Sequence, residues 1–310
     1  MATVSFGGDK MFIAKVPASS ANLGPGFDCM GIALKLYCRA EFEEIDSGFE
    51  IEVVNEGNGY VPQNENNLVY KAMQSLYVKA GKELSGIRVR LDSDIPVTRG
   101  LGSSSAAIVA GLVGANHLLG NMFSEDELLY EAYEIEGHPD NVTPALLGGF
   151  TISFPENGRI IRSKTVLAEN IKFAAILPNF YLPTRKSRGY LPDFTKMKNA
   201  VYNISRASML SAALVKGDTE LLSHCFRDRI HQKYRFPHIK SGEYIIRAAK
   251  RLGASGGYIS GAGPTIMSVV SSNYEEFELG MNKLIKTNLP DWRLVMLEAD
   301  NDGAVIEKKI

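Results

Sequence analysis

A glycine-rich segment in the first half of the chain, residues 96–106 (PVTRGLGSSSA), constrains the fold more than any other feature. Before it, at residues 87–91, apolar side chains alternate with two arginines, which is the period of a half-buried strand. After it, small and apolar residues continue to about residue 119 and predict a helix. Glycines let the backbone approach a ligand closely, and the free N–H groups at a helix start attract phosphate. The segment therefore predicts a strand, a phosphate-binding loop and a helix.

Two better-known phosphate-binding loops do not fit this segment. No lysine precedes its serines as in GxxxxGK[ST], and Ser105 stands where the third glycine of the GxGxxG dinucleotide fingerprint belongs. A tight strand-to-helix turn capped by serine is the alternative that needs no ligand. If the segment binds ATP, its serine hydroxyls are available to phosphate oxygens or to a magnesium ion. The residues then expected to bind ATP are Pro96, Val97, Thr98, Arg99, Gly100, Leu101, Gly102, Ser103, Ser104, Ser105 and Ala106.

The apolar periodicity along the chain mixes strands and helices without the regular alternation of a doubly wound sheet. We therefore expect an α+β protein of two domains, 1–165 and 166–310, joined at a poorly marked point near residues 155–170. Further strands are expected at 49–53, 150–154, 173–177, 257–259, 266–270 and 292–297, and further helices at 125–136, 197–216, 218–229, 242–252 and 274–287. The helix at 197–216 places four apolar residues on one face: Ile204, Ala207, Leu210 and Leu214.

The charges nearly cancel, with 34 Lys and Arg against 35 Asp and Glu. Such a chain has no overall field to hold nucleic acid or an anionic membrane, so neither is expected as a partner. The three cysteines form no CxxC pair and are typical of buried residues in a reducing compartment. No apolar run reaches the ~18 residues that span a bilayer, and Gly7, Gly8 and Asp9 interrupt the place of a signal-peptide core. We therefore expect a cytoplasmic protein.

Two further segments, residues 17–28 (PASSANLGPGFD) and 260–265 (SGAGPT), add to the central loop. Together the three resemble the motifs of the GHMP kinase superfamily, in the right order and at the right separations, and within it the homoserine kinase family is the most similar. Supporting segments are EGHPDNVTPA at 136–145, T-x3-R followed by LP at 184–192, and DRIHQKYR at 228–235. The resemblance covers residues 12–305, nearly the whole chain.

The resemblance implies the fold and the reaction of that family. The N-terminal domain is then like the second domain of ribosomal protein S5, and the C-terminal domain is ferredoxin-like. ATP is expected between them, with its phosphates on the central loop. The implied reaction transfers the γ-phosphate of ATP to the side-chain hydroxyl of L-homoserine on the route to threonine. The implied assembly is a homodimer.

Glu136 is a candidate metal ligand. At about 100° per residue, it falls on the same helix face as Leu128, Leu129 and Ala132, where an unpaired carboxylate is costly. Magnesium is a good partner, and the resemblance makes Glu136 and Ser104 its two protein ligands. The alternative is a helix-end glutamate that reaches solvent past Gly137.

Homoserine offers a carboxylate, an ammonium and a primary alcohol. Arg188 and Arg235 suit bidentate capture of the carboxylate and match the family's arginines, and Asp140 beside His138 suits the ammonium. Basic segments at 171–191 and 223–238 contain both arginines. The substrate residues that the resemblance implies are Asn22, Asp28, His138, Asp140, Thr184, Arg188, Arg235 and Gly261, and the catalytic ones are Asp28, Asn141 and Arg188.

The sequence departs from some relatives at Asn141, where mevalonate-kinase-like proteins have an aspartate often assigned as general base. Asparagine cannot accept the proton, so we expect transfer to rely on positioning and charge neutralisation, with Asp28 as a possible acceptor. Asn67 matches the family segment near adenine. The other histidines are interpreted as structural or surface residues: His117, His224, His231 and His238.

Three alternatives remain open at this point. The first is a GHMP kinase for another small hydroxy acid such as mevalonate, although the paired arginines argue against a neutral sugar. The second is a non-catalytic binding protein of the same fold, which an intact set of Glu136, Ser104 and arginines disfavours. The third is a nicotinamide-dependent dehydrogenase, which lacks its glycine fingerprint.

Overall fold

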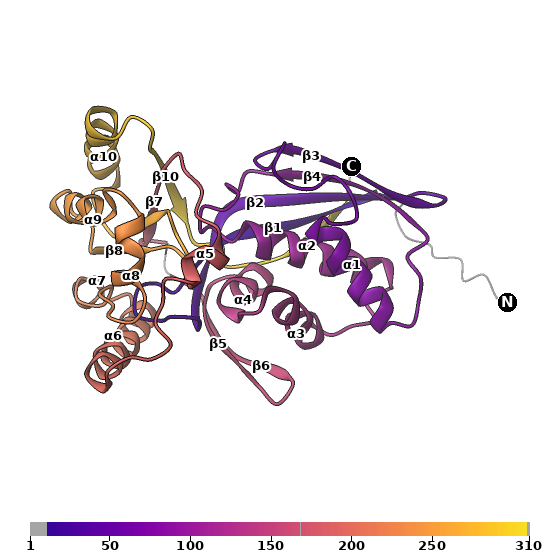
Figure 1. The fold of residues 1–310 in the computed structure, drawn as a ribbon, viewed down its shortest axis with the longest axis horizontal. Helices are drawn as coiled ribbons and strands as arrows, with labels where there is room; N and C mark the ends of the chain where they lie inside the picture. The colour runs from indigo at the N-terminus through magenta and orange to yellow at the C-terminus, as the bar shows by residue number, and fades with distance from the viewer. Residues whose placement is uncertain (1–10, 168, 309–310) are drawn as a thin grey trace.

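The computed structural model describes residues 11–167 and 169–308. Two parts lie side by side along the long axis in Figure 1, the first half of the chain in indigo to magenta and most of the second half in orange to yellow. The prediction that the chain has no signal peptide was based on Gly7, Gly8 and Asp9. These three residues lie outside the described part of the chain. Within residues 11–167 and 169–308, no helix has the length and apolar character to cross a bilayer.

The first part is built on a mixed sheet that has seven strands in the described chain. Its main path runs β11-β1-β2-β4-β3, and β5 pairs with β2 and β6. All of its pairs are antiparallel except β3 with β4, which are parallel. The strands are β1 (Met11–Ala21), β2 (Met30–Glu44), β3 (Gly48–Asn55), β4 (Gly86–Ser93), β5 (Phe150–Glu156), β6 (Arg159–Thr165) and β11 (Val305–Lys308).

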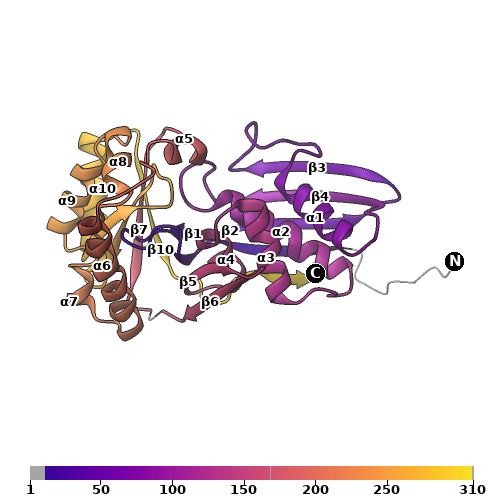
Figure 2. The ribbon, with the colours of Figure 1, turned by 60° about the horizontal axis from the view of Figure 1, so that its bottom comes forward.

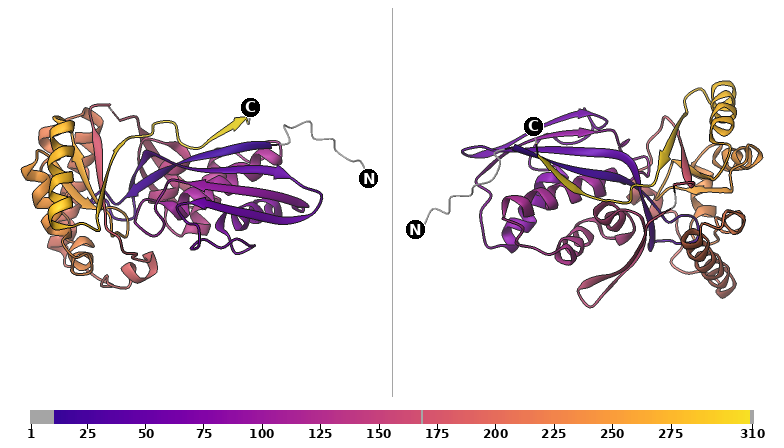
Figure 3. Two further views of the ribbon diagram at one scale, coloured as in Figure 1. Left: turned by 90° about the horizontal axis from the view of Figure 1, so that it is seen from above. Right: turned by 180° about the vertical axis from the view of Figure 1, so that it is seen from behind.

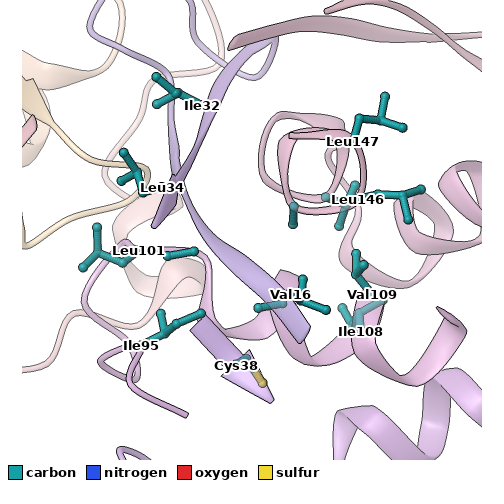
Figure 4. Packing of buried hydrophobic residues seen from close by; sticks show 14 of the residues in the cluster. Val16, Ile32, Leu34, Cys38, Ile95, Leu101, Ile108, Val109, Leu146 and Leu147 are labelled. Carbon is teal, nitrogen blue, oxygen red and sulfur yellow. The ribbon is translucent and has the colours of Figure 1, made fainter. Parts of the chain in front are cut away.

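Helices cover one face of this sheet, as Figure 3 shows from above. They are α1 (Leu68–Lys79), α2 (Ser103–Leu118), α3 (Glu125–Glu136) and α4 (Pro139–Leu147). Helix α2 is apolar on all sides because it packs against β1, β2 and the three other helices. In Figure 4, Val16 of β1 lies against Ile108 and Val109 of α2, all fully buried. This core fixes the start of α2 close to the end of β1.

The second part has a sheet whose four described strands are all antiparallel, in the order β10-β7-β9-β8. Its strands are β7 (Lys172–Leu177), β8 (Gly256–Ile259), β9 (Ile266–Val270) and β10 (Arg293–Glu298). Its helices are α5 (Thr184–Arg188), α6 (Met197–Lys216), α7 (Thr219–Leu222), α8 (Gln232–Arg235), α9 (Gly242–Arg251) and α10 (Tyr274–Asn288), with a 3-10 turn at Phe236–His238. Figure 2 shows α6, α7, α9 and α10 on the side away from the first sheet, whereas α5 lies between the two parts.

The α+β, two-domain architecture is confirmed. One expected helix is wrong: residues 218–229 form only α7, and the chain then turns. The reason lies at Asp228, whose carboxylate accepts the N–H groups of Ile230, His231 and Gln232 and so starts α8 instead. Ile204, expected on the buried face of α6, is 64% exposed. The elements that were not predicted are helices α1, α4, α5 and α8 and strands β1, β2, β6 and β11.

The chain passes between the two sheets twice. Strand β6 of the first sheet is followed by β7 of the second, close to the predicted division at 165/166, which stays a prediction. After β10, the chain returns, and β11 pairs with β1 in the first sheet. Figure 3 shows this yellow strand beside the indigo ones. The last strand therefore lies in the part built by the first half.

Candidate active site

A cavity of about 370 Å³ lies where the two parts meet. It collects residues from both halves of the chain that the sequence assigned to ATP, metal or substrate. Those lining it are Asn22, Asp28, Asn67, Val97, Thr98, Arg99, Gly100, Gly102, Ser103, Ser104, Glu136, His138, Asp140, Asn141, Thr184, Arg188, Arg235 and Gly261. Four of the residues predicted to bind ATP are buried beside the cavity instead of lining it: Pro96, Leu101, Ser105 and Ala106.

The glycine loop is shaped by contacts within the protein. Gly100 and Gly102 have φ of +81° and +72°, which side chains rarely adopt. A Cβ on Gly100 would stand 2.3 Å from the carbonyl oxygen of Ser260, and one on Gly102 would stand 2.1 Å from Ser19 Oγ. We expected these glycines to let the backbone approach a ligand, and both line the cavity. Their missing side chains make room for the 260–265 loop and for β1.

Further bonds hold the loop in place. Ser260 Oγ donates to the carbonyl oxygen of Gly100 (2.5 Å), and the N–H of Thr265 donates to that of Arg99 (3.2 Å). Helix α2 begins after Gly102, which has no side chain to cap the first N–H groups. These donors start at the cavity wall, where Gly102, Ser103 and Ser104 lie. The arrangement leaves a helix N-terminus available to an anion.

Glu136 faces the serines at the start of α2. The hydroxyls of Ser104 and Ser105 donate to Glu136 Oε1 over 2.8 and 2.9 Å. Ser124 and Glu127 form a capping box that starts α3, and Gly137, with φ of +86°, ends it. Burial raises the pKa of Glu136 above its ordinary value, although the two serines oppose this. The carboxylate therefore points toward the loop and not, as in the alternative, into solvent.

Asp28 and Arg188 form a bidentate ion pair at the other end of the cavity. Arg188 Nη1 donates to Asp28 Oδ2 (2.9 Å) and Nη2 to Oδ1 (2.7 Å). Both side chains are about one third exposed. The hydrogen bonds to Asp28 raise the pKa of Arg188. The sequence assigned these residues to different groups of the substrate and did not indicate that they pair with each other.

Arg235 is almost fully buried. Its Nη1 donates to the carbonyl oxygen of Gly261 and to His231 Nδ1, both over 2.9 Å. Among the described residues, its Nε has no hydrogen-bond partner. Burial, together with the charge of Arg188, lowers the pKa of Arg235 to about 10. Arg235 is thus a fixed cation at the cavity wall, and its buried Nε–H is left for a ligand.

His231 fixes Arg235 from behind. Arginine cannot accept a hydrogen bond, so His231 Nδ1 is the acceptor, and Nε2 donates to the carbonyl oxygen of Gly24 (2.7 Å). This is the neutral tautomer, and burial lowers the pKa of His231 to about 4. Phe27 stacks on the imidazole, with ring centroids 5.1 Å apart, and lies under the guanidinium groups of Arg188 (5.7 Å) and Arg235 (5.5 Å). Sequence reasoning missed Phe27, whose only signal was its place before Asp28.

Asn22 connects the two ends of the chain. Its Nδ2 donates to the carbonyl oxygen of Gly261 (2.8 Å), and its Oδ1 accepts the N–H of Asp28 (3.0 Å). Both Asn22 and Asp28 lie in the left-handed backbone region. Asn22 therefore positions Asp28 and Gly261 by its own amide.

Asp140 is buried beside His138. His138 Nδ1 lies 2.8 Å from Asp140 Oδ1, and Asn141 Nδ2 donates to the same oxygen (3.3 Å). Burial lowers the pKa of His138, but the hydrogen bond and charge of Asp140 outweigh it and give a net rise. Asn141 also accepts from Ser19 Oγ (2.9 Å). The amide is thus held on both sides and carries no group that can take a proton.

The remaining wall of the cavity combines an apolar surface with the polar side chains of Glu56, Asn66 and Ser93. Asn67, predicted to contact adenine, is the N-cap of α1: its Oδ1 accepts the N–H of Val69, and its Nδ2 donates to the carbonyl oxygen of Pro62. The wall beside it was missed in the sequence because its members come from four separate segments. They are Cys38, Val61, Pro62, Leu68, Leu91 and Ala107. A flat apolar ring fits such a wall.

The family model for the N-terminal domain of GHMP kinases matches residues 67–149, and the model for the C-terminal domain of GHMP kinases matches residues 210–282. The homoserine kinase of Caldicellulosiruptor saccharolyticus is 43% identical over 299 residues, which is 96% of each chain. That of Clostridium beijerinckii is 44% identical over 299 residues, 96% of this chain and 98% of its own.

Solved structures agree with these relatives. The homoserine kinase of Cytophaga hutchinsonii superposes with a TM-score of 0.87 at 27% identity, covering 99% of both chains. A putative homoserine kinase of Listeria monocytogenes gives 0.79 at 31% identity, covering 96% of this chain and all of its own. The mevalonate kinase of L. major, at 16% identity and a TM-score of 0.67, shares the fold.

Proposed function

The chain belongs to the GHMP kinase family, among the homoserine kinases, and we propose that it makes O-phospho-L-homoserine from L-homoserine and ATP. The observation that carries this function is the single cavity that joins the glycine loop, Glu136 and two arginines. The loop suits the phosphates, and the arginines suit a carboxylate. The product is an intermediate of threonine biosynthesis.

At the phosphate end, the start of α2 would hold the ATP phosphates by its N–H groups and dipole. We assign a magnesium ion to Glu136 and Ser104, because their oxygens already meet at 2.8 Å. The described residues contain no group of three or more His, Cys, Asp or Glu fit for a metal. With two protein ligands, the remaining positions of the ion would be filled by phosphate and water, as is usual for magnesium. When bound, the ion would supply charge neutralisation on the transferred phosphoryl group.

At the substrate end, Arg235 and Arg188 would bind the homoserine carboxylate, with Thr184 beside them. Asp140, held by His138, would bind the ammonium group. The ion pair with Asp28 gives Arg188 a second role. When the arginine turns toward the substrate carboxylate, Asp28 loses a partner close to the reacting hydroxyl.

Proton transfer is the point at which this site departs from a mechanism with a general base at position 141. Asn141 cannot accept the proton, so we propose that positioning and charge neutralisation carry most of the rate, with Asp28 as the candidate acceptor. The test is Asp28→Asn. A kcat close to that of the unchanged enzyme excludes Asp28 as base, whereas a loss of about a thousandfold supports it.

An assay of alternative alcohols tests the function itself. We expect ADP release with homoserine to exceed that with serine, threonine and mevalonate, and to require magnesium. Equal rates with mevalonate would favour the other small-hydroxy-acid kinase. Absence of ADP release with every alcohol would favour a binding protein without catalysis.

Three further assignments concern the protein as a whole. We propose a cytoplasmic location, a homodimer, and a division into domains near residue 165 with the last strand returning to the first sheet. Light scattering of the purified protein tests the assembly. Expression of residues 1–165 alone tests whether that unit folds.

A further inference from the structure

A second cavity, of about 370 Å³, lies in the second half of the chain. It is lined by residues of α6, α8, α9 and β8 and by the loop between α7 and α8. Helix α8 contributes Gln232 and Lys233 to this cavity and Arg235 to the active site. The two cavities therefore share one short helix.

The inner wall of this cavity is apolar and tightly built. Phe226, Phe236 and Ile246 line it, and so does the bare backbone of Gly256 and Gly257. Phe226 stacks on Tyr258 with ring centroids 5.6 Å apart. A Cβ on Gly256 would stand 2.4 Å from the Phe226 ring, so the flat wall depends on the glycine.

The rim of the cavity is strongly basic. Five cations line it, all exposed: Arg227, Arg229, Lys233, Arg247 and Lys250. Within the described part of the chain, Arg247 alone among them has an ion pair, 3.7 Å from Glu243 and exposed, which contributes little. Asp228, the other acid, is buried and occupied by three backbone N–H groups and Asn203. In a chain of net charge −1, this gathering of positive charge is a local feature.

We propose that this cavity is a second ligand site, which binds a small organic phosphate carrying a flat apolar ring. The ring would lie on the wall of Phe226 and Ile246, and the phosphate would meet the basic rim. The guanidinium of Arg229 already lies over the Tyr202 ring, 3.8 Å from the centroid, and its N–H groups suit phosphate oxygens. The mixture of an apolar floor with convergent charged groups is typical of small-molecule sites.

Occupation of this site acts on the active site through α8. Asp228 caps the start of the helix, and Gln232 binds the carbonyl oxygen of Phe226 and the N–H of Ile259. His231, at the start of this helix, accepts a hydrogen bond from Arg235 at its end. A phosphate that draws Arg229 and Lys233 together shifts the helix that carries Arg235. We therefore expect the KM for homoserine to change and the KM for ATP to stay the same, a step that rests on the proposed kinase function.

The probe is 1-naphthyl phosphate, titrated by its fluorescence into the full chain with saturating ADP and magnesium to occupy the phosphate loop. We expect binding in the millimolar range or tighter, with 1-naphthol and inorganic phosphate each at least about tenfold weaker. The double variant Arg229→Glu/Lys250→Glu should weaken the probe about tenfold or more. Lys240→Glu, which removes an exposed cation outside the cavity, should change the affinity less than twofold.

Several results would overturn the proposal. The proposed site would be contradicted if 1-naphthol bound as tightly as its phosphate. It would also be contradicted if the double variant and Lys240→Glu lost the same amount of affinity for the probe. A probe that binds but leaves the KM for homoserine unchanged would remove the coupling through α8. The fluorescence titration does not use catalysis. An enzyme inactive on homoserine that still binds the probe would therefore count against the kinase function alone.

Discussion

The two ends of the active-site cavity are built in different ways. The phosphate end comes from consecutive residues, 100–105, with Glu136 added from the next helix. The substrate end comes from segments far apart in the chain, which contribute Asp28, Arg188 and Arg235. Backbone shape holds the first end, and paired charges hold the second. The first is thus fixed before a ligand arrives, whereas the second can exchange its partners.

The comparison predicts that changes at the phosphate end act mainly on kcat, and changes at the substrate end on the KM for homoserine. The largest effect is expected for Glu136→Gln. Loss of the charge should reduce kcat by about a thousandfold and raise the magnesium concentration needed. Glu134→Gln, an exposed glutamate of the same helix, is the control and should keep normal activity. Steady-state kinetics over a range of magnesium concentrations would measure both changes. A near-normal kcat for Glu136→Gln would contradict the prediction that the phosphate end acts on kcat.

The next largest effect is expected for Gly100→Ala. The new methyl group would meet the Ser260 carbonyl oxygen at 2.3 Å and force φ out of +81°, so the loop must move. We expect kcat/KM to fall about a hundredfold and the free energy of unfolding to drop by about 2 kcal/mol or more. Gly217→Ala is the control: its φ is +66°, but its Cβ would have open space. That variant should lose only about 1 kcal/mol and no activity.

A smaller and more selective effect is expected for Arg188→Lys. Lysine cannot reproduce the two parallel hydrogen bonds to a carboxylate. The KM for homoserine should rise roughly tenfold to a hundredfold while the KM for ATP changes less than twofold. Arg185→Lys, on the same short helix and exposed, is the matched control. An equal rise in both KM values would mean that the two ends are not separate.

The smallest effect is expected in stability and depends on pH. His231 has a pKa lowered to about 4 in the folded protein, against about 6.5 when unfolded. Below pH 6.5 the unfolded chain binds the proton more readily, so stability falls as the pH drops toward 4. The contribution is about 1.4 kcal/mol per pH unit in that window. Urea unfolding at pH 7 and 5 should show this slope reduced in His231→Gln and kept in His224→Gln, whose histidine is exposed.

The sequence predicts the phosphate end well because its signals are local. All of these signals lie within one stretch of chain: the alternating residues before the loop, the small residues after it, and the apolar helix face that carries Glu136. The fold class and most of the strands and helices follow from the same kind of periodicity. Asp228 shows the limit: its carboxylate accepts three backbone N–H groups and starts α8, where no helix was predicted.

The substrate end could be assembled only from family resemblance, and its internal pairing was not predicted. Nothing near Asp28 in the sequence indicates a bidentate bond to Arg188, 160 residues away. In the same way, His231 and Phe27 show no sign in the sequence of holding an arginine. Likewise, nothing near Gly100 in the sequence indicates the close approach of Ser260, which is equally distant along the chain.

The return of β11 to β1 has a consequence for synthesis on the ribosome. The outer edge of β1 stays unpaired until residues 305–308 have emerged, after the whole second half. Throughout translation the nascent first sheet therefore presents an open edge that other chains can pair with. The residues that close it are made only after the whole second sheet. A nascent chain cut short before residue 305 leaves that edge exposed, however well its active site has formed.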